Sequence, residues 1–301
     1  AAQPDVVSIQ PYLSPEKYDE RQAQIVAGNV IGSSLNGPGY LDWLAQKGFT
    51  QEQFDASGFV VDVSDSGIDN GTLTPGHFAL YAKGNPVGAS RIAYNRLEGT
   101  GHAGGTLAGC DGHGTLNAHI VAGYSDLTGF PHTDSLGFRY GLGVCPFVRI
   151  GSSVVFDPIQ FTFPNYADLQ SRAYADGARI SVNSWGMTNN TYTVDAQAFD
   201  ALVRDAQPDG AAISTPGNQE MVIVFAAGNR GPTGNSVGSP GTAKNVITVG
   251  ASENVRSLNA INGGKSSMGA DGCGYSDAIA DAANDLAIFS SRGPCSDGRM
   301  K

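Results

Sequence analysis

The sequence predicts a three-layer α/β fold, in which a mostly parallel sheet carries helices on both faces. Three observations predict it: apolar runs of strand length, helical patterns between them, and a glycine-rich composition with few charges. Runs rich in Val and Ile suit strands that are covered on both faces, as in parallel sheets. Strands that alternate with helices favour the three-layer architecture.

The predicted elements begin at Gly58, where the pattern of the sequence changes. The expected strands are 58–64, 148–156, 178–182, 221–225 and 245–249. Helical patterns at 165–174 and 194–204 fall between strands. Before Gly58, alternation at 6–9 suggests a short strand and 14–17 resembles a helix start.

Composition excludes several function classes. With 301 residues, the chain can form one large domain or two small ones. It carries 28 acidic and 18 basic residues, a formal charge of −10, which argues against nucleic acid and anionic membranes as partners. We find no apolar stretch of membrane-spanning length.

The cysteines give no thiolate metal site, because Cys110, Cys145, Cys273 and Cys295 form no CxxC pair. Cys145, before an apolar run, is interpreted as a buried free thiol. Cys273 and Cys295 both lie in Gly- and Asp-rich sequence, where we expect a disulfide. The sequence leaves the pairing open.

Asp65 follows the first strong strand directly, in Asp65-Ser66-Gly67. An Asp at a buried strand end needs hydrogen bonds or a charged partner. Taken alone, it is better interpreted as a turn residue.

His113 lies between two glycines in Asp111-Gly112-His113-Gly114-Thr115 and opens a helical pattern. Flanking glycines leave the imidazole accessible, as a general base requires.

Two further strand ends carry small or polar residues. One is Ser184-Trp185-Gly186, which follows the strand at 178–182. The other is Ala226-Ala227-Gly228-Asn229, which follows the strand at 221–225. Small residues let a substrate approach closely and Asn offers an amide donor, although Gly-Asn alone is an ordinary turn.

Together these motifs resemble the subtilases in order, residue type and position relative to strands. The segment 289–294 and the following 297–299 look like that family's approach to its nucleophile. The resemblance covers roughly 58–301 and implies a subtilisin-like fold and a serine endopeptidase. It also implies a secreted or extracellular protein that acts on polypeptides. Calcium is common in the family as a structural ion, but no ligand loop is identified here, and no cofactor enters the chemistry.

The resemblance implies a role for each matched residue. His113 would be the general base, Asp65 would orient it, and Asn229 would donate to the oxyanion. The segments 184–186 and 226–228 would form opposite walls of the substrate cleft. No metal is assigned to these residues.

The sequence departs from the family in two places. After His113-Gly114-Thr115 it has Leu116, Asn117, Ala118 and His119 where the family continues with His-Val-Ala-Gly. It also contains no Gly-Thr-Ser. We therefore expect the chain to stop before the nucleophilic serine and to be inactive alone.

Domain boundaries follow from the same comparison. Residues 1–25 resemble a propeptide tail or N-terminal extension, and 26–301 an incomplete catalytic domain. A propeptide and the C-terminal remainder of the same protein are therefore expected partners. The rival interpretation is a non-catalytic pseudoprotease that binds peptide or protein. A nucleotide-binding domain is disfavoured because no glycine-rich phosphate loop opens a helix.

Overall fold

The computed structural model describes residues 19–134, 136–255 and 282–301. The strand and helix start expected at 6–9 and 14–17 lie outside these residues, as does Cys273. The described helices and their short 3₁₀ turns are α1 (Asp19–Val26), α2 (Tyr40–Gln46), α3 (Gln51–Ser57), η1 (Phe78–Leu80), η2 (Ala82–Gly84), α4 (His113–Ala122), α5 (Tyr166–Ala175) and α6 (Val194–Arg204). None of the described helices is long and apolar enough to cross a bilayer.

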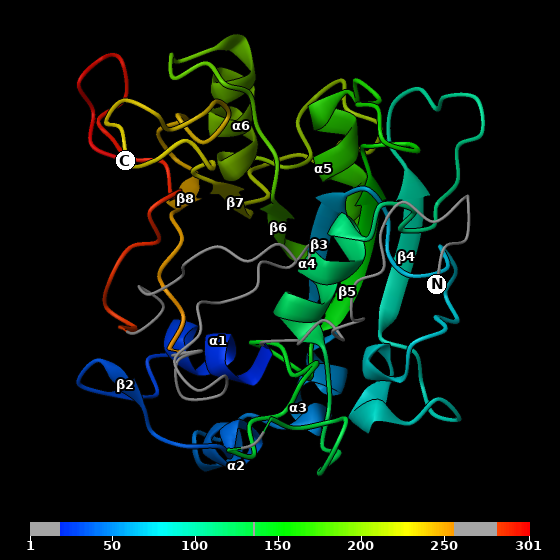
Figure 1. The fold of residues 1–301 in the computed structure, drawn as a ribbon. Coiled ribbons are helices and arrows are strands. Elements are labelled where there is room, and N and C mark those ends of the chain that lie inside the picture. Colours follow the sequence, from blue (N-terminus) through cyan, green and yellow to red (C-terminus); the bar gives the residue numbers. More distant parts are fainter. Residues whose placement is uncertain (1–18, 135, 256–281) are drawn as a thin grey trace, which may run out of the picture.

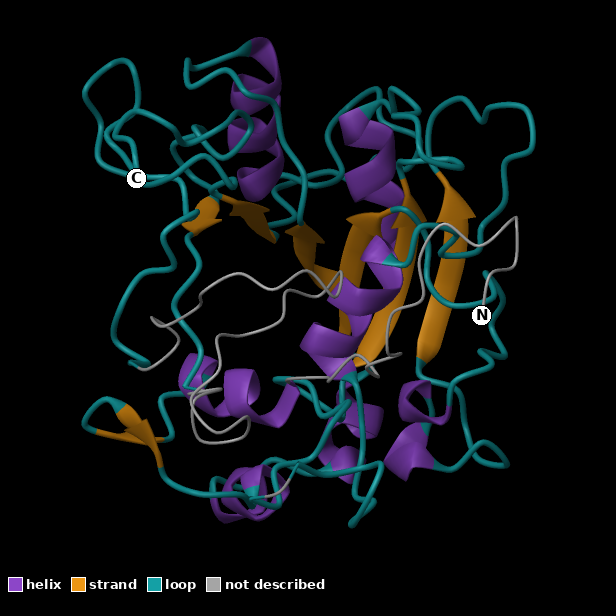
Figure 2. Ribbon diagram, in the orientation of Figure 1, coloured by secondary structure: helices purple, strands orange, loops and turns teal. Residues whose placement is uncertain are grey.

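A six-stranded, entirely parallel sheet forms the centre of the described structure (Figure 1). Its spatial order is β4 (Ile92–Leu97), β5 (Arg149–Val154), β3 (Val60–Asp65), β6 (Ala178–Asn183), β7 (Val222–Ala226) and β8 (Ile247–Val249). A small antiparallel ribbon of β1 (Val30–Ile31) and β2 (Ser34–Leu35) lies apart from it (Figure 2). The predicted fold class is confirmed.

Helices cover both faces of the sheet. On one face α4 contacts β3 and β5, and Val61, Val63 and Ala118 are buried in one cluster there. On the other face α5 and α6 pack over β6 and β7, where Phe199 and Phe225 are fully buried. Successive side chains of a strand point to opposite faces, so β3 contributes to both cores.

The N-terminal helix α1 packs against α2 and α4. Its Glu20 is buried and accepts hydrogen bonds from the backbone N–H groups of Gly39 (2.8 Å) and Tyr40 (2.9 Å). Arg21 of the same helix forms an ion pair with Asp134 at 2.7 Å. Residues 19–26 are thus held in the folded molecule, and where a propeptide would end stays a prediction.

All five strands predicted from the sequence are present, and their ends differ from the predicted ones by no more than two residues. The helices expected at 165–174 and 194–204 are α5 and α6. Asn165 caps α5 by accepting from the backbone N–H of Ala167 and Asp168. The strand of this sheet that the sequence did not predict is β4, an edge strand on which buried and half-buried residues alternate only at its start.

Candidate active site

Three neighbouring strands, β3, β6 and β7, bring the candidate residues to one edge of the sheet. Asp65 is the last residue of β3, Ser184 follows β6, and Ala226 ends β7. Because the three strands are parallel, their carboxyl ends meet at the same edge. Ligand and catalytic sites of open α/β sheets lie at such edges.

Asp65 and His113 form a hydrogen-bonded pair although 48 positions separate them in the chain. Oδ1 of Asp65 lies 2.8 Å from Nδ1 of His113. Asp65 is buried, whereas the His113 side chain is 52% exposed. A carboxylate on Nδ1 favours the tautomer in which Nδ1 carries the proton and Nε2 is free to accept one.

The first turn of α4 is held close to the loop that follows β3. The backbone N–H of Gly114 donates to Oγ of Ser66 at 3.1 Å, and that of His113 donates to Oδ1 of Asp111 at 3.0 Å. A Cβ at Gly114 would come within 2.4 Å of the Gly67 carbonyl oxygen. Only glycine permits this approach, which explains one of the two glycines that flank His113.

Asn117 lies one helical turn after His113 and links the pair to the neighbouring strand. Its Nδ2 donates to Oδ2 of Asp65 at 3.1 Å, and its Oδ1 accepts from Oγ of Ser184 at 3.1 Å. The sequence marked Asn117 as a departure from the family but gave it no role. Its position relative to β6 depends on the tertiary fold, so the sequence carried no signal for the bond to Ser184.

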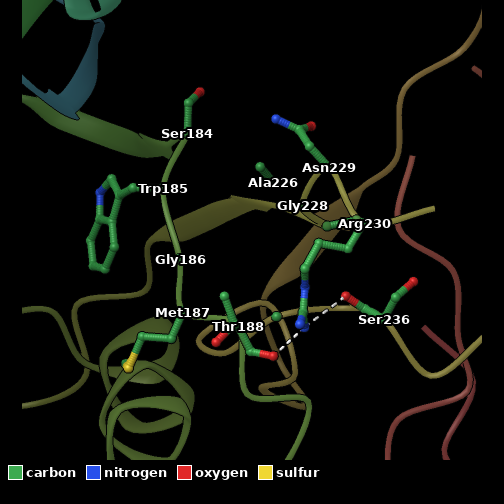
Figure 3. Close-up of a pocket in the computed structure, with 12 residues that line it drawn as sticks. Ser184, Trp185, Gly186, Met187, Thr188, Ala226, Gly228, Asn229, Arg230 and Ser236 are labelled. Carbon is green, nitrogen blue, oxygen red and sulfur yellow. Dashed lines mark hydrogen bonds between the residues drawn. The ribbon is translucent and has the colours of Figure 1, made fainter. Parts of the chain in front are cut away.

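A cavity of about 210 Å³ lies beside Ser184 (Figure 3). The segment 184–188 forms one wall and 226–230 the other, while Ser236 and Gly238 complete the lining. Asn229, the predicted oxyanion donor, lines it, and so do all the cleft residues predicted from the sequence: Ser184, Trp185, Gly186, Ala226, Ala227 and Gly228. The structure therefore brings both predicted walls together.

Individual side chains of the walls differ in direction. The ring of Trp185 points away from Asn229 and Arg230 in Figure 3 and packs against Phe225, with ring centroids 5.2 Å apart. Asn229 is exposed, and its amide lies at the same end of the cavity as Ser184 (Figure 3). That end adjoins the Asp65–His113 pair, because Ser184 is bonded to Asn117.

Arg230 is the one charged residue among the five lining residues that the sequence analysis missed, the others being Met187, Thr188, Ser236 and Gly238. Its Nη2 donates to the carbonyl oxygens of Thr188 and Ser236, the latter at 3.4 Å. Its guanidinium extends to the end of the cavity opposite Ser184 (Figure 3). The available signal was a charged residue directly after Ala226-Ala227-Gly228-Asn229.

A second carboxylate of β3, Asp62, is fully buried in the opposite face of the sheet. Its Oδ1 accepts from the hydroxyls of Tyr94 (2.9 Å) and Ser153 (2.7 Å). Burial raises the pKa of Asp62 to about 6, and the nearby charge of Glu98 adds to the rise.

The remaining predictions concern cysteines and metals. Cys145 is a free thiol but only partly buried, against the core beneath α4. Cys295 is buried, and its expected disulfide partner Cys273 lies outside the described residues, so the bridge stays a prediction. Over the described ranges, no group of three or more His, Cys, Asp or Glu side chains is arranged to hold a metal ion.

The sequence of this chain is similar to sequences of known serine proteases. The sequence model of the subtilase family, Peptidase S8, matches residues 56–301. A curated protein from Dictyostelium discoideum, serine protease/ABC transporter B family protein tagD, is 26% identical over 208 residues. The match covers 65% of this chain but only 10% of that protein, so the chain spans about a tenth of its relative's length.

Solved structures of subtilisin-like proteases are also similar. The psychrophilic protease Apa1 from Pseudoalteromonas sp. AS-11 has a TM-score of 0.46 and 16% identity, over 83% of this chain and 42% of Apa1. The protease domain of PatA, solved as a point mutant, has a TM-score of 0.44 and 19% identity, over 79% of this chain and 63% of the PatA chain.

Proposed function

Because the chain belongs to the subtilase family of serine proteases, we propose that it forms most of an endopeptidase active site that a serine outside these 301 residues completes. The observation that carries the proposal is the 2.8 Å hydrogen bond between buried Asp65 and half-exposed His113. A buried carboxylate that fixes an accessible imidazole is the arrangement a general base needs.

The proposed mechanism begins at Nε2 of His113. Nε2 takes the proton of the serine hydroxyl as the serine oxygen bonds to the peptide carbonyl carbon, and His113 then gives that proton to the leaving amine. Asp65 holds the proton on Nδ1 and stabilises the imidazolium that forms between these steps. Water then hydrolyses the acyl-enzyme by the same route, with His113 as the base.

The cavity next to this pair gives the substrate its place. We assign the two walls, 184–188 and 226–230, to the side chain of the residue before the scissile bond. Asn229 lies at the end of the cavity that adjoins the catalytic pair, and we assign its amide to the oxyanion of the tetrahedral intermediate. The substrate class is a polypeptide, and a propeptide of the same protein would occupy the same cleft.

Expression of the 301-residue chain beside a version extended along its gene tests the proposal. The extension should encode Gly-Thr-Ser, and the extended protein should hydrolyse casein, whereas the 301 residues alone should not. His113→Ala in the extended protein should abolish hydrolysis. If the 301 residues alone hydrolyse casein, and His113→Ala abolishes that hydrolysis, the nucleophile lies within this chain.

The alternative function is that of a pseudoprotease, which binds peptides without cutting them. One observation favours it: among the described residues, no hydroxyl or thiol is hydrogen-bonded to Nε2 of His113. The gene sequence separates the two functions, because Ala or Gly at the serine position would exclude hydrolysis and leave binding.

A further inference from the structure

The cavity between the two walls contains a single ionisable side chain among its described lining residues. Only Arg230 carries a charge, and the others are small, apolar or neutral polar residues. A guanidinium is a cation that donates hydrogen bonds and accepts none. Whatever occupies the cavity must therefore accommodate one positive charge.

Arg230 is held in place by neutral groups. Its Nη2 donates to the carbonyl oxygens of Thr188 and Ser236, which belong to opposite sides of the cavity. Its backbone N–H donates to Oγ of Ser291 at 3.1 Å. Within the described residues, no carboxylate forms an ion pair with it.

The guanidinium has donors that these bonds leave unused. It has five N–H donors in a planar fork, and the two bonds to carbonyl oxygens both come from Nη2. Nε and Nη1 make no hydrogen bond to the described residues, so they can donate to a carboxylate that enters the cavity. Such charge-assisted bonds are about twice as strong as neutral ones.

We infer that the cavity selects an acidic side chain, Asp or Glu, at the residue before the scissile bond, and that Arg230 is the residue that determines this specificity. The inference rests on the proposed function, since that function places the scissile bond beside Asn229. Arg230 extends to the opposite end of the cavity from Asn229 (Figure 3), where the tip of a side chain would lie.

The lining gives an apolar side chain less to contact. The ring of Trp185 is turned into the core, and Gly186, Ala226 and Gly228 of the walls offer little apolar surface, which leaves Met187 as the larger apolar lining side chain. An apolar side chain would cover a guanidinium without hydrogen-bonding to it, and covering a charge in this way is unfavourable. A basic side chain would add direct repulsion.

Peptide binding to the 301-residue chain tests the inference without requiring a nucleophile. The probes are fluorescent peptide amides that differ only in their last residue, which is Glu, Asp, Gln, Leu or Lys. We expect the Glu or Asp peptide to bind at least about tenfold more tightly than the Gln peptide. Arg230→Gln should remove that difference, and Arg230→Lys should keep part of it.

The matched control is Arg204→Gln, which removes an exposed Arg at the end of α6. It should leave every ratio unchanged, and thermal melts should show that all variants are folded. Tightest binding of the Leu peptide, an unchanged Glu-to-Gln ratio in Arg230→Gln, or no binding of any peptide would overturn the inference.

Hydrolysis of the same sequences by the extended protein separates this inference from the proposed function. Cleavage with the same preference in kcat/KM supports both. Cleavage without a preference for Asp or Glu overturns the specificity and leaves the protease. Acidic selectivity in binding without any cleavage keeps the specificity of the cavity and removes the protease.

Discussion

Two aspartates on one strand, Asp62 and Asp65, show how differently the interior and the edge of the same sheet treat a carboxylate. Both are buried. Asp62 lies within the sheet and accepts hydrogen bonds from hydroxyls alone, from Tyr94, Ser153 and, at 3.4 Å, Ser181. Asp65 ends the strand and faces an imidazole, an amide and a backbone N–H.

The two aspartates have different partners because they lie on opposite faces of the sheet and at different positions along β3. Val61, Val63 and Asp65 point toward α4, which brings His113 and Asn117, whereas Asp62 points toward the core under α5. Asp62 is surrounded by neighbouring strands, and its partners are hydroxyl groups of β4, β5 and β6. The edge admits groups from loops and helix starts, and there a carboxylate can act on another residue.

The largest expected effect concerns this pair of aspartates directly. In the extended protein, Asp65→Asn should lower kcat by about 10⁴-fold, because an amide no longer fixes the tautomer of His113. Asp62→Asn should leave kcat within about twofold, because it lies on the other face of the sheet and shares no partner with His113. Steady-state hydrolysis of one peptide by both variants measures this, and equal losses would mean that the edge has no special role.

The next effect lies at the same edge but on the segment after β7. Asn229→Ala should lower kcat by about 10²- to 10³-fold with little change in KM, since the amide meets a charge that forms only in the transition state. Asn183, though near, is a poor control, because its Nδ2 bonds to Ser181 and Val224 inside the sheet. Asn85→Ala, in an exposed turn, is the better one, and a KM-dominated loss would argue against the assignment.

Asp62 should make the stability of the protein depend on pH. The pKa of Asp62 is about 6 in the folded protein and about 3.9 when unfolded. Between these two pH values the folded state therefore binds more protons than the unfolded state. The contribution of Asp62 to the free energy of unfolding is complete below about pH 3.9 and is lost as pH rises through about 6. In Asp62→Asn this pH-dependent loss of stability, about 3 kcal/mol at most, should be absent.

Urea unfolding of the 301-residue chain and of Asp62→Asn between about pH 4 and pH 8 measures the difference. The variant should gain free energy of unfolding relative to the parent as pH rises. Asp209→Asn, which changes an exposed turn, serves as the control. A difference that does not vary with pH would show that Asp62 titrates as an exposed carboxyl does.

The smallest expected effect concerns Asn117, which is hydrogen-bonded to Asp65 of the proposed catalytic pair. Asn117→Ala should lower kcat about tenfold, because Asp65 loses one of its donors. The acidic limb of the pH–rate profile should shift as well, which a merely structural role would not produce. Leu116→Ala, exposed on the same turn, is the control, and an unchanged profile in Asn117→Ala would contradict the positioning role.

Much of the candidate site at the edge of the sheet was predictable, because its residues lie in short sequence motifs. Asp65 and His113 stand at a strand end and a helix start, and each carries its own short motif. Arg230 directly follows such a motif but is not part of it. Its direction depends on the carbonyl groups of Thr188 and Ser236, and Thr188 lies 42 positions away in the chain.

The interior was harder to predict than the edge. Asp62 was not singled out from the sequence, and its partner Tyr94 belongs to β4, which the sequence did not predict. β4 alternates imperfectly, because an edge strand is covered less evenly than a central one. Local patterns located the elements, whereas the polar contacts between elements required the tertiary structure.

The link from Asp65 through Asn117 to Ser184 has a consequence for the order of events during folding. Its two hydrogen bonds span 52 and 67 positions of the chain, and the entropy of closing such long loops must be lost before the contacts stabilise the fold. A partly folded molecule can contain β3 and α4 and still lack an aligned imidazole beside a finished pocket. The alignment that the proposed chemistry needs therefore arises from tertiary folding, once the segment after β6 has reached α4.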